Sequence, residues 1–150
     1  RKKHAFYGQV NYHFDTSILN TSYRFMTDDW DIDSHTLDSR FRVKLTDNSY
    51  IQPHFRYYQQ SAADFYQPFL IEGSLLPSVA SADYRLGEMT AYTIGLKYGQ
   101  ALDNGREWAV RLEYYQQSPK NAGFDEPGAL QGLDLYPSID AIIAQVSYSF

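Results

Sequence analysis

The sequence predicts an all-β fold: an antiparallel, up-and-down transmembrane β-barrel. Three observations predict it: a period-two alternation of apolar and polar residues, aromatic residues near the ends of the alternating segments, and connections that alternate between short and long. Aromatic residues make up 17% of the 150 residues, although the net charge is −5 and the mean hydropathy is −0.50. Such a polar chain, without a long apolar run, excludes a transmembrane helix but suits strands with one apolar side.

Seven segments alternate in this way, and each is close to the ~9–11 residues that a tilted strand needs to cross a bilayer. No charged residue lies on the apolar side of any of them. The segments are 6–14, 18–25, 36–45, 51–58, 91–98, 108–115 and 142–150, and their apolar sides are marked, in that order, by Phe6 and Val10, Leu19 and Tyr23, Leu37 and Phe41, Ile51 and Phe55, Ile94 and Leu96, Val110 and Leu112, and Ile142 and Val146.

The opposite sides of these segments carry a basic stripe with few acids. On the barrel prediction these residues line the lumen, where cations along a low-dielectric wall concentrate anions. The alternative is that the cations pair with acids elsewhere, as in a narrow barrel whose side chains fill the lumen. The basic residues are Arg24, Arg40, Arg42, Lys44, Arg56, Lys97 and Arg111, and the acids are Asp38 and Glu113.

A soluble sheet also alternates, so the choice of a membrane barrel depends on the rims and the connections. The connections 15–17, 46–49 and 100–106 are short, whereas 59–88 and 118–138 are long, as in barrels with short periplasmic turns and long outer loops. The apolar residues of 59–88 suggest either a constriction or a partner surface. The aromatic residues expected at the membrane interfaces are Phe14, Tyr57, Tyr98, Trp108 and Tyr114.

The last strand, 139–150, predicts a role in assembly. Its alternating Val146, Tyr148 and Phe150 resemble the C-terminal signal of bacterial outer-membrane proteins, which the barrel assembly machinery reads. Barrels made of one bacterial chain have even strand numbers. Seven strands therefore predict either a further strand within 62–86 or, as we favour, that residues 1–150 are the C-terminal portion of a larger barrel.

Two further patterns each have two interpretations. The sequence Tyr-Tyr-Gln-Gln-Ser occurs at 57–61 and at 114–118, either as a carbohydrate-binding rim or as a shared way of crossing the outer interface. Asp28, Asp29 and Asp31, with Asp33, form either a calcium site or a solvated acidic loop, and the missing glycine and distal glutamate favour the loop.

The sequence offers no pattern for catalysis or a cofactor. It has no cysteine, which excludes disulfides, thiolate metal sites and cysteine nucleophiles. It has no phosphate-binding glycine loop, no metalloprotease motif and no histidine cluster. We therefore predict a protein that is not an enzyme and holds no metal or cofactor. The pI near 5.2 argues against nucleic acid as a partner.

The stretches 30–66, 82–87 and 92–99 resemble a bacterial family of unknown function. The resemblance implies an outer-membrane barrel in Gram-negative bacteria and a full-length protein longer than this chain. It implies no functional residues, because the family has no established activity.

The sequence thus predicts an outer-membrane β-barrel protein that acts as a passive pore or transporter, or as a structural sheath for an envelope partner. A soluble ligand-binding β-barrel and, less favoured, an outer-membrane enzyme are the alternatives. The expected partners are outer-membrane lipid and lipopolysaccharide, the barrel assembly machinery and, for a sheath, another envelope protein.

Overall fold

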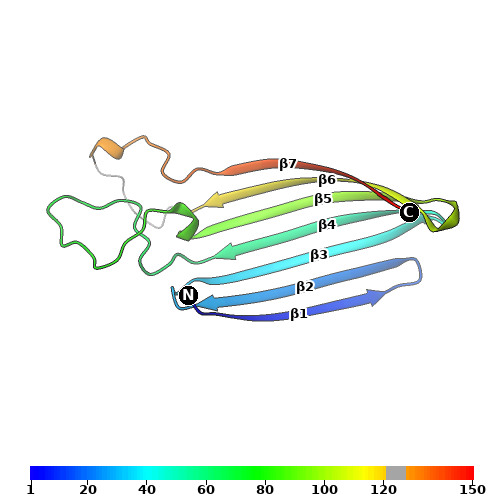
Figure 1. Ribbon diagram of the computed structural model, residues 1–150, viewed down its shortest axis with the longest axis horizontal. Coiled ribbons are helices and arrows are strands. Elements are labelled where there is room, and N and C mark those ends of the chain that lie inside the picture. Colours follow the sequence, from blue (N-terminus) through cyan, green and yellow to red (C-terminus); the bar gives the residue numbers. More distant parts are fainter. Residues whose placement is uncertain (121–127) are drawn as a thin grey trace.

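The computed structural model describes residues 1–120 and 128–150, which form one antiparallel sheet of seven strands in the order β1 to β7 (Figure 1). Each strand pairs with the next along the chain, so the predicted up-and-down topology is confirmed. The sheet is open, with β1 and β7 as its edges. The strands are β1 Lys3–His13, β2 Ser17–Asp28, β3 Asp33–Thr46, β4 Ser49–Gln60, β5 Met89–Ala101, β6 Glu107–Pro119 and β7 Ile139–Ser149.

The six strand pairings bring the seven apolar sides onto one face of the sheet. Phe6 pairs with Phe25, Leu96 with Leu112, and Val110 with Val146. A slip of one residue in any pairing would turn that strand's apolar side to the other face. The register therefore confirms the side assigned to each strand. We call the face with Phe41, Phe55, Leu96, Leu112 and Val146 the apolar face, and the opposite one the polar face.

Burial in this sheet is the reverse of that in a soluble sheet, where the apolar face is covered. Leu96 and Val146 on the apolar face are 50% and 77% exposed. His54 and Glu113 on the polar face are each only 9% exposed. The polar side chains cover one another, whereas nothing in the described structure covers the apolar ones.

All connections at one end of the strands are short, whereas the other end has both long connections and also the short β2–β3 connection, residues 29–32 (Figure 1). The short connections β1–β2, β3–β4 and β5–β6 lie at one end, and the last of these contains the 3-10 helix η2, Asp103–Gly105. The long connections β4–β5 and β6–β7 lie at the other, with the 3-10 helices η1 Tyr84–Leu86 and η3 Gly128–Leu130. Residues 62–86 contain no strand, so the further strand considered there is absent. Part of the predicted 118–138 connection, 121–127, lies outside the described residues.

A small hydrophobic cluster forms where the long connections begin. Ile32, Ala63 and Tyr66 are buried together, and Trp30, Ala62, Phe65, Leu86 and Tyr136 pack against them. The cluster joins the β2–β3 connection to both long ones. None of the helices in the described ranges is long and apolar enough to span a membrane.

Candidate functional site: the polar face of the sheet

The centre of the polar face is a buried imidazole between two carboxylates. His54 Nε2 lies 3.1 Å from Asp38 Oδ2, and its Nδ1 lies 2.8 Å from Glu113 Oε1. Ionised carboxylates only accept hydrogen bonds, so the ring can donate to both only when each of its nitrogens carries a proton. This Asp38–His54–Glu113 triad connects three strands, β3, β4 and β6.

Glycine makes this contact possible. His54 of β4 pairs with Gly95 of β5, which in turn pairs with Glu113 of β6. A Cβ atom on Gly95 would stand 2.5 Å from Glu113 Cγ. Because Gly95 has no side chain, residues two strands apart meet across β5.

The same arrangement recurs nearer the short-connection end. Gly99 of β5 lies under the ring of Tyr50, and a Cβ there would overlap the ring atoms. The Tyr50 hydroxyl donates to Glu107 Oε1 at 2.7 Å. The guanidinium of Arg42 lies 3.5 Å from the centre of the same ring, a distance typical of a cation–π contact.

Arginines surround both networks. Arg40 and Arg56 lie 3.5 and 4.0 Å from the same oxygen, Asp38 Oδ2. Arg111 lies 3.7 Å from Glu113 Oε1. The acids of the polar face therefore hold several arginines in place at once.

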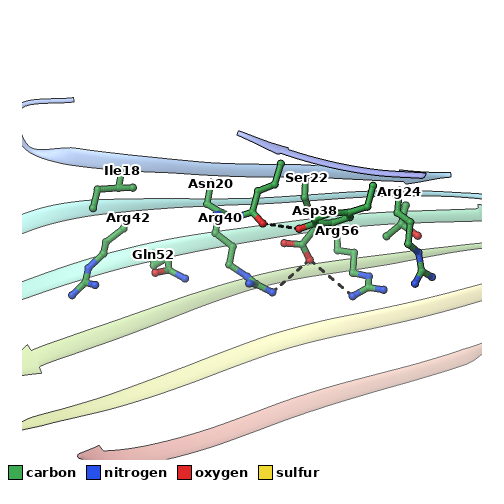
Figure 2. A pocket seen from close by; sticks show the side chains of 12 residues that line it. Ile18, Asn20, Ser22, Arg24, Asp38, Arg40, Arg42, Gln52 and Arg56 are labelled. Carbon is green, nitrogen blue, oxygen red and sulfur yellow. Dashed lines mark hydrogen bonds and ion pairs between the residues drawn. The ribbon is translucent and has the colours of Figure 1, made fainter. Parts of the chain in front are cut away.

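A pocket of about 580 Å³ opens on the polar face over β1 to β4 (Figure 2). Figure 2 shows four arginine side chains in succession along it: Arg42, Arg40, Arg56 and Arg24. Asp38 is the only carboxylate among the described residues that line it. The pocket combines a positive lining with open access to solvent.

All seven predicted basic residues lie on the polar face, as do Asp38 and Glu113. Six of the seven cations have an acid within 4.0 Å: Arg40 and Arg56 have Asp38, Arg42 and Lys97 have Glu107, Lys44 has Asp47, and Arg111 has Glu113. Arg24 has none in the described ranges. Asp38, Glu107 and Glu113 belong to strands of the same sheet and Asp47 to the β3–β4 turn, so most of the stripe is paired, but with acids of the chain's own strands and turn rather than of further strands or a plug.

Sequence reasoning missed several features of this site, among them Tyr50, Glu107 and the bridging role of His54. Glu107 lies outside the predicted strand, which begins at Trp108, yet its odd number places it on the same side of β6 as Arg111 and Glu113. His54 is on the polar side of the predicted strand 51–58, opposite Ile51 and Phe55, but the alternation does not predict its role as a bridge. Nothing in the sequence brings it to Glu113, 59 residues away.

The predicted interface aromatics lie on the apolar face towards both strand ends. Tyr98 and Trp108 contact each other near the short connections, with ring centroids 5.5 Å apart, and Phe14 contacts Phe41 there. Towards the long connections, Tyr57 contacts Tyr92 at 5.4 Å, and the Tyr114 hydroxyl donates to Asp140. In the predicted assembly strand, Val146 and Tyr148 are exposed on the apolar side of the edge strand β7, and Phe150 follows it.

The repeated Tyr-Tyr-Gln-Gln sequence forms hydrogen bonds within its own strand. Tyr57 and Tyr58 each donate to the glutamine two residues on, Gln59 and Gln60. Gln60 also donates to the carbonyl oxygens of Arg85 and Gly87, which anchors the end of the β4–β5 connection. In the second copy Tyr115 donates to Gln117 in the same way, whereas Tyr114 donates to Asp140, so the two copies share one Tyr-x-Gln hydrogen bond, which supports the structural interpretation of the repeat.

Ionisable groups in the β4–β5 connection have displaced pKa values, among them Tyr66 and Asp83. Burial in the hydrophobic cluster raises the pKa of Tyr66. The hydrogen bond from the Arg85 side chain lowers the pKa of Asp83, which also caps η1. Both groups lie outside the sheet, so these pKa shifts concern the β4–β5 connection and not the pocket.

The acidic stretch 28–33 has a structural role. Asp28 pairs with Arg1 and accepts hydrogen bonds from the backbone N–H groups of Trp30 and Ile32. Across the described residues, no group of three or more His, Asp or Glu side chains is arranged to hold a metal ion.

The family described as "Protein of unknown function (DUF3570)" matches residues 1–150. The chain therefore belongs to this uncharacterised family. No curated protein and no solved structure matches the chain.

Proposed function

We propose that this chain forms part of the wall of a bacterial outer-membrane β-barrel that gives polar solutes a passive route across the membrane. The observation that carries the proposal is the reversed burial of the sheet. Its apolar face is exposed, and its ionic face is the more buried one. Hydrocarbon would cover the first face, and the second would enclose water.

The distribution of charge on the apolar face supports a membrane-spanning band. In the strands described, this face carries only two carboxylates, Asp33 and Asp140, and both lie at the long-connection end. From His35 to Leu45, β3 rises about 33 Å at about 3.3 Å per residue. A tilt of about 40° reduces this to about 25 Å, the height of the apolar band of membrane barrels.

The two sheet edges support closure with further strands. β1 and β7 each present an unpaired edge of 11 residues. Long exposed edges invite pairing, and a barrel removes them. We propose that strands outside this chain complete the barrel, and that 139–150 is the strand read by the barrel assembly machinery.

A structural sheath for an envelope partner is the second candidate. The observation that favours it is the tip of the β4–β5 connection, where Leu70, Ile71, Leu75 and Leu76 are all more than half exposed. A partner protein or lipopolysaccharide would cover these residues. The proposal assigns the chain no enzymatic step and no cofactor.

The location is tested by expressing the full-length protein and separating the membranes. The proposal expects the protein in the outer-membrane fraction, resistant to carbonate or urea extraction and soluble only in detergent. A protein that remains in solution without detergent would instead be a soluble ligand-binding barrel.

The two functions are then separated in planar lipid bilayers. A pore gives stepwise conductance with the purified protein alone. A sheath gives none and co-purifies with a fixed proportion of an envelope protein.

A further inference from the structure

We propose that Arg24, Arg40, Arg42 and Arg56, named here the arginine track, conduct small oxyanions, that is carboxylates and phosphates, along the polar face. This inference rests on the proposed barrel and deepens it by naming the class of solute. The barrel alone requires only a water-filled passage, whereas the track gives it a preference.

The four arginines occupy successive levels of the sheet. Arg42 lies opposite Ile18, Arg40 opposite Asn20, Arg56 opposite Asp38, and Arg24 opposite Thr36. Asp38 pairs in turn with Ser22, so the cross-strand rows advance by two residues from one arginine to the next. Such rows are about 7 Å apart along the strands. A solute with a negative group can therefore contact the next arginine before it leaves the last.

The track keeps its positive charge in spite of the neighbouring acids. Four arginines and one carboxylate are among the described residues that line the pocket. That carboxylate, Asp38, is also within hydrogen-bond distance of His54, as is Glu113, while Glu107 accepts from the Tyr50 hydroxyl. The acids are thus engaged behind the track, where they fix the arginines in position.

The arginines remain available to a ligand. The side chains of Arg40 and Arg56 are 43% and 47% exposed although both contact Asp38. Arg24 is exposed and has no acid partner in the part of the chain that the structure describes.

Guanidinium chemistry selects oxyanions over chloride. Its planar fork of N–H donors matches two oxygens of a carboxylate or phosphate, which a spherical halide does not offer. Asn20, Ser22 and Gln52 line the same pocket and supply neutral hydrogen-bonding groups. Several weak sites in succession allow entry as well as release, which conduction requires.

The experiment uses the full-length protein in planar bilayers with potassium salts. We expect an anion-selective zero-current potential in a potassium chloride gradient, and block of the chloride current by inorganic phosphate or acetate. Arg24→Gln should raise the blocking concentration about tenfold, the loss of one charge-assisted hydrogen bond. Arg85→Gln is the matched control, since Arg85 pairs with Asp83 outside the pocket, and it should change nothing.

The outcomes separate this inference from the proposed function. Conductance that is cation-selective, or indifferent to phosphate, acetate and Arg24→Gln, overturns the track and leaves the barrel intact. If the protein conducts no ions, the proposed pore and conduction along the track both fail, and titration of phosphate into the detergent-solubilised protein then tests the oxyanion-binding part of the inference. Binding that Arg24→Gln weakens and Arg85→Gln does not supports it, and no binding by the unaltered protein overturns it.

Discussion

Individual residues of β5 determine how the polar face is filled. Gly95 and Gly99 lie on that face two levels apart, and each leaves space for a large side chain from a neighbouring strand. Glu113 occupies one space and Tyr50 the other. The ionic networks therefore depend on two positions that carry no side chain.

A methyl group at Gly99 should disturb this packing. Gly99→Ala places a Cβ against a Tyr50 ring that Glu107 and Arg42 hold in place. Overpacking of this kind costs about 1–3 kcal/mol. We expect a lower midpoint of urea unfolding for the detergent-solubilised full-length protein.

Gly8→Ala is the control for this change. A Cβ atom on Gly8 would meet no other atom within 4 Å, so its addition should leave the midpoint unchanged. Equal midpoints for the two variants would contradict the close packing of Tyr50 on Gly99.

Each strand of the sheet has one apolar side and one polar side. The register of six pairings aligns seven apolar sides, which a single slip would disrupt. Charge is therefore expected to be tolerated on one side of a strand and rejected on the other.

Leu96→Arg tests this difference. Leu96 is in the middle of β5 on the apolar face, and a cation facing lipid there costs about 2–4 kcal/mol near the bilayer midplane. We expect reduced assembly in the outer membrane and a smaller free energy of unfolding. Gln9→Arg, on the polar side of β1, should change neither, and equal tolerance of the two would mean that lipid does not cover the apolar face.

The side chain of Gln60 links the end of β4 to the end of the β4–β5 connection. Gln60→Ala removes both hydrogen bonds to the backbone at Arg85 and Gly87. We expect faster tryptic cleavage after Arg85, followed by mass spectrometry. Gln59→Ala is the adjacent control, because the described hydrogen bond of the Gln59 side chain is to Tyr57 of its own strand. In this variant, cleavage after Arg85 should be as slow as in the unaltered protein.

For the molecule as a whole, the β4–β5 connection extends beyond the strand ends and does not return over the sheet (Figure 1). The base of the β4–β5 connection is packed around Tyr66, whereas Leu75 at its tip is fully exposed. The apolar tip therefore does not constrict the polar face in this arrangement.

Replacing residues 69–77 with a short Gly-Ser linker should leave the conductance unchanged. The backbone hydrogen bonds between Gln67 and Ser81 and between Ser81 and Phe65 remain to close the shortened loop. Single-channel recordings of the two proteins provide the comparison. An increase in conductance would show that the tip does enter the passage, and loss of a co-purifying envelope protein would assign it to the partner.

The seven strands, the side on which each residue lies, and the placement of both long connections at one end of the sheet were all predictable from the amino-acid order. Side chains alternate direction at every residue of a strand, which makes sidedness a local property. The basic stripe was predictable for the same reason. The sequence predicted the positive charge of the stripe and the side of the strands on which it lies, but not the acids with which its residues pair.

Which polar groups meet depends on the folded sheet. His54 reaches Glu113 across Gly95, and Tyr50 reaches Glu107 across Gly99, because pairing brings together strands that are distant in the chain. Pairing between strands also forms the cluster around Tyr66 and places Arg24 in line with the other three arginines of the track. Such contacts depend on the register between strands and on the space that neighbouring strands leave. The alternation within a single segment predicts neither of these.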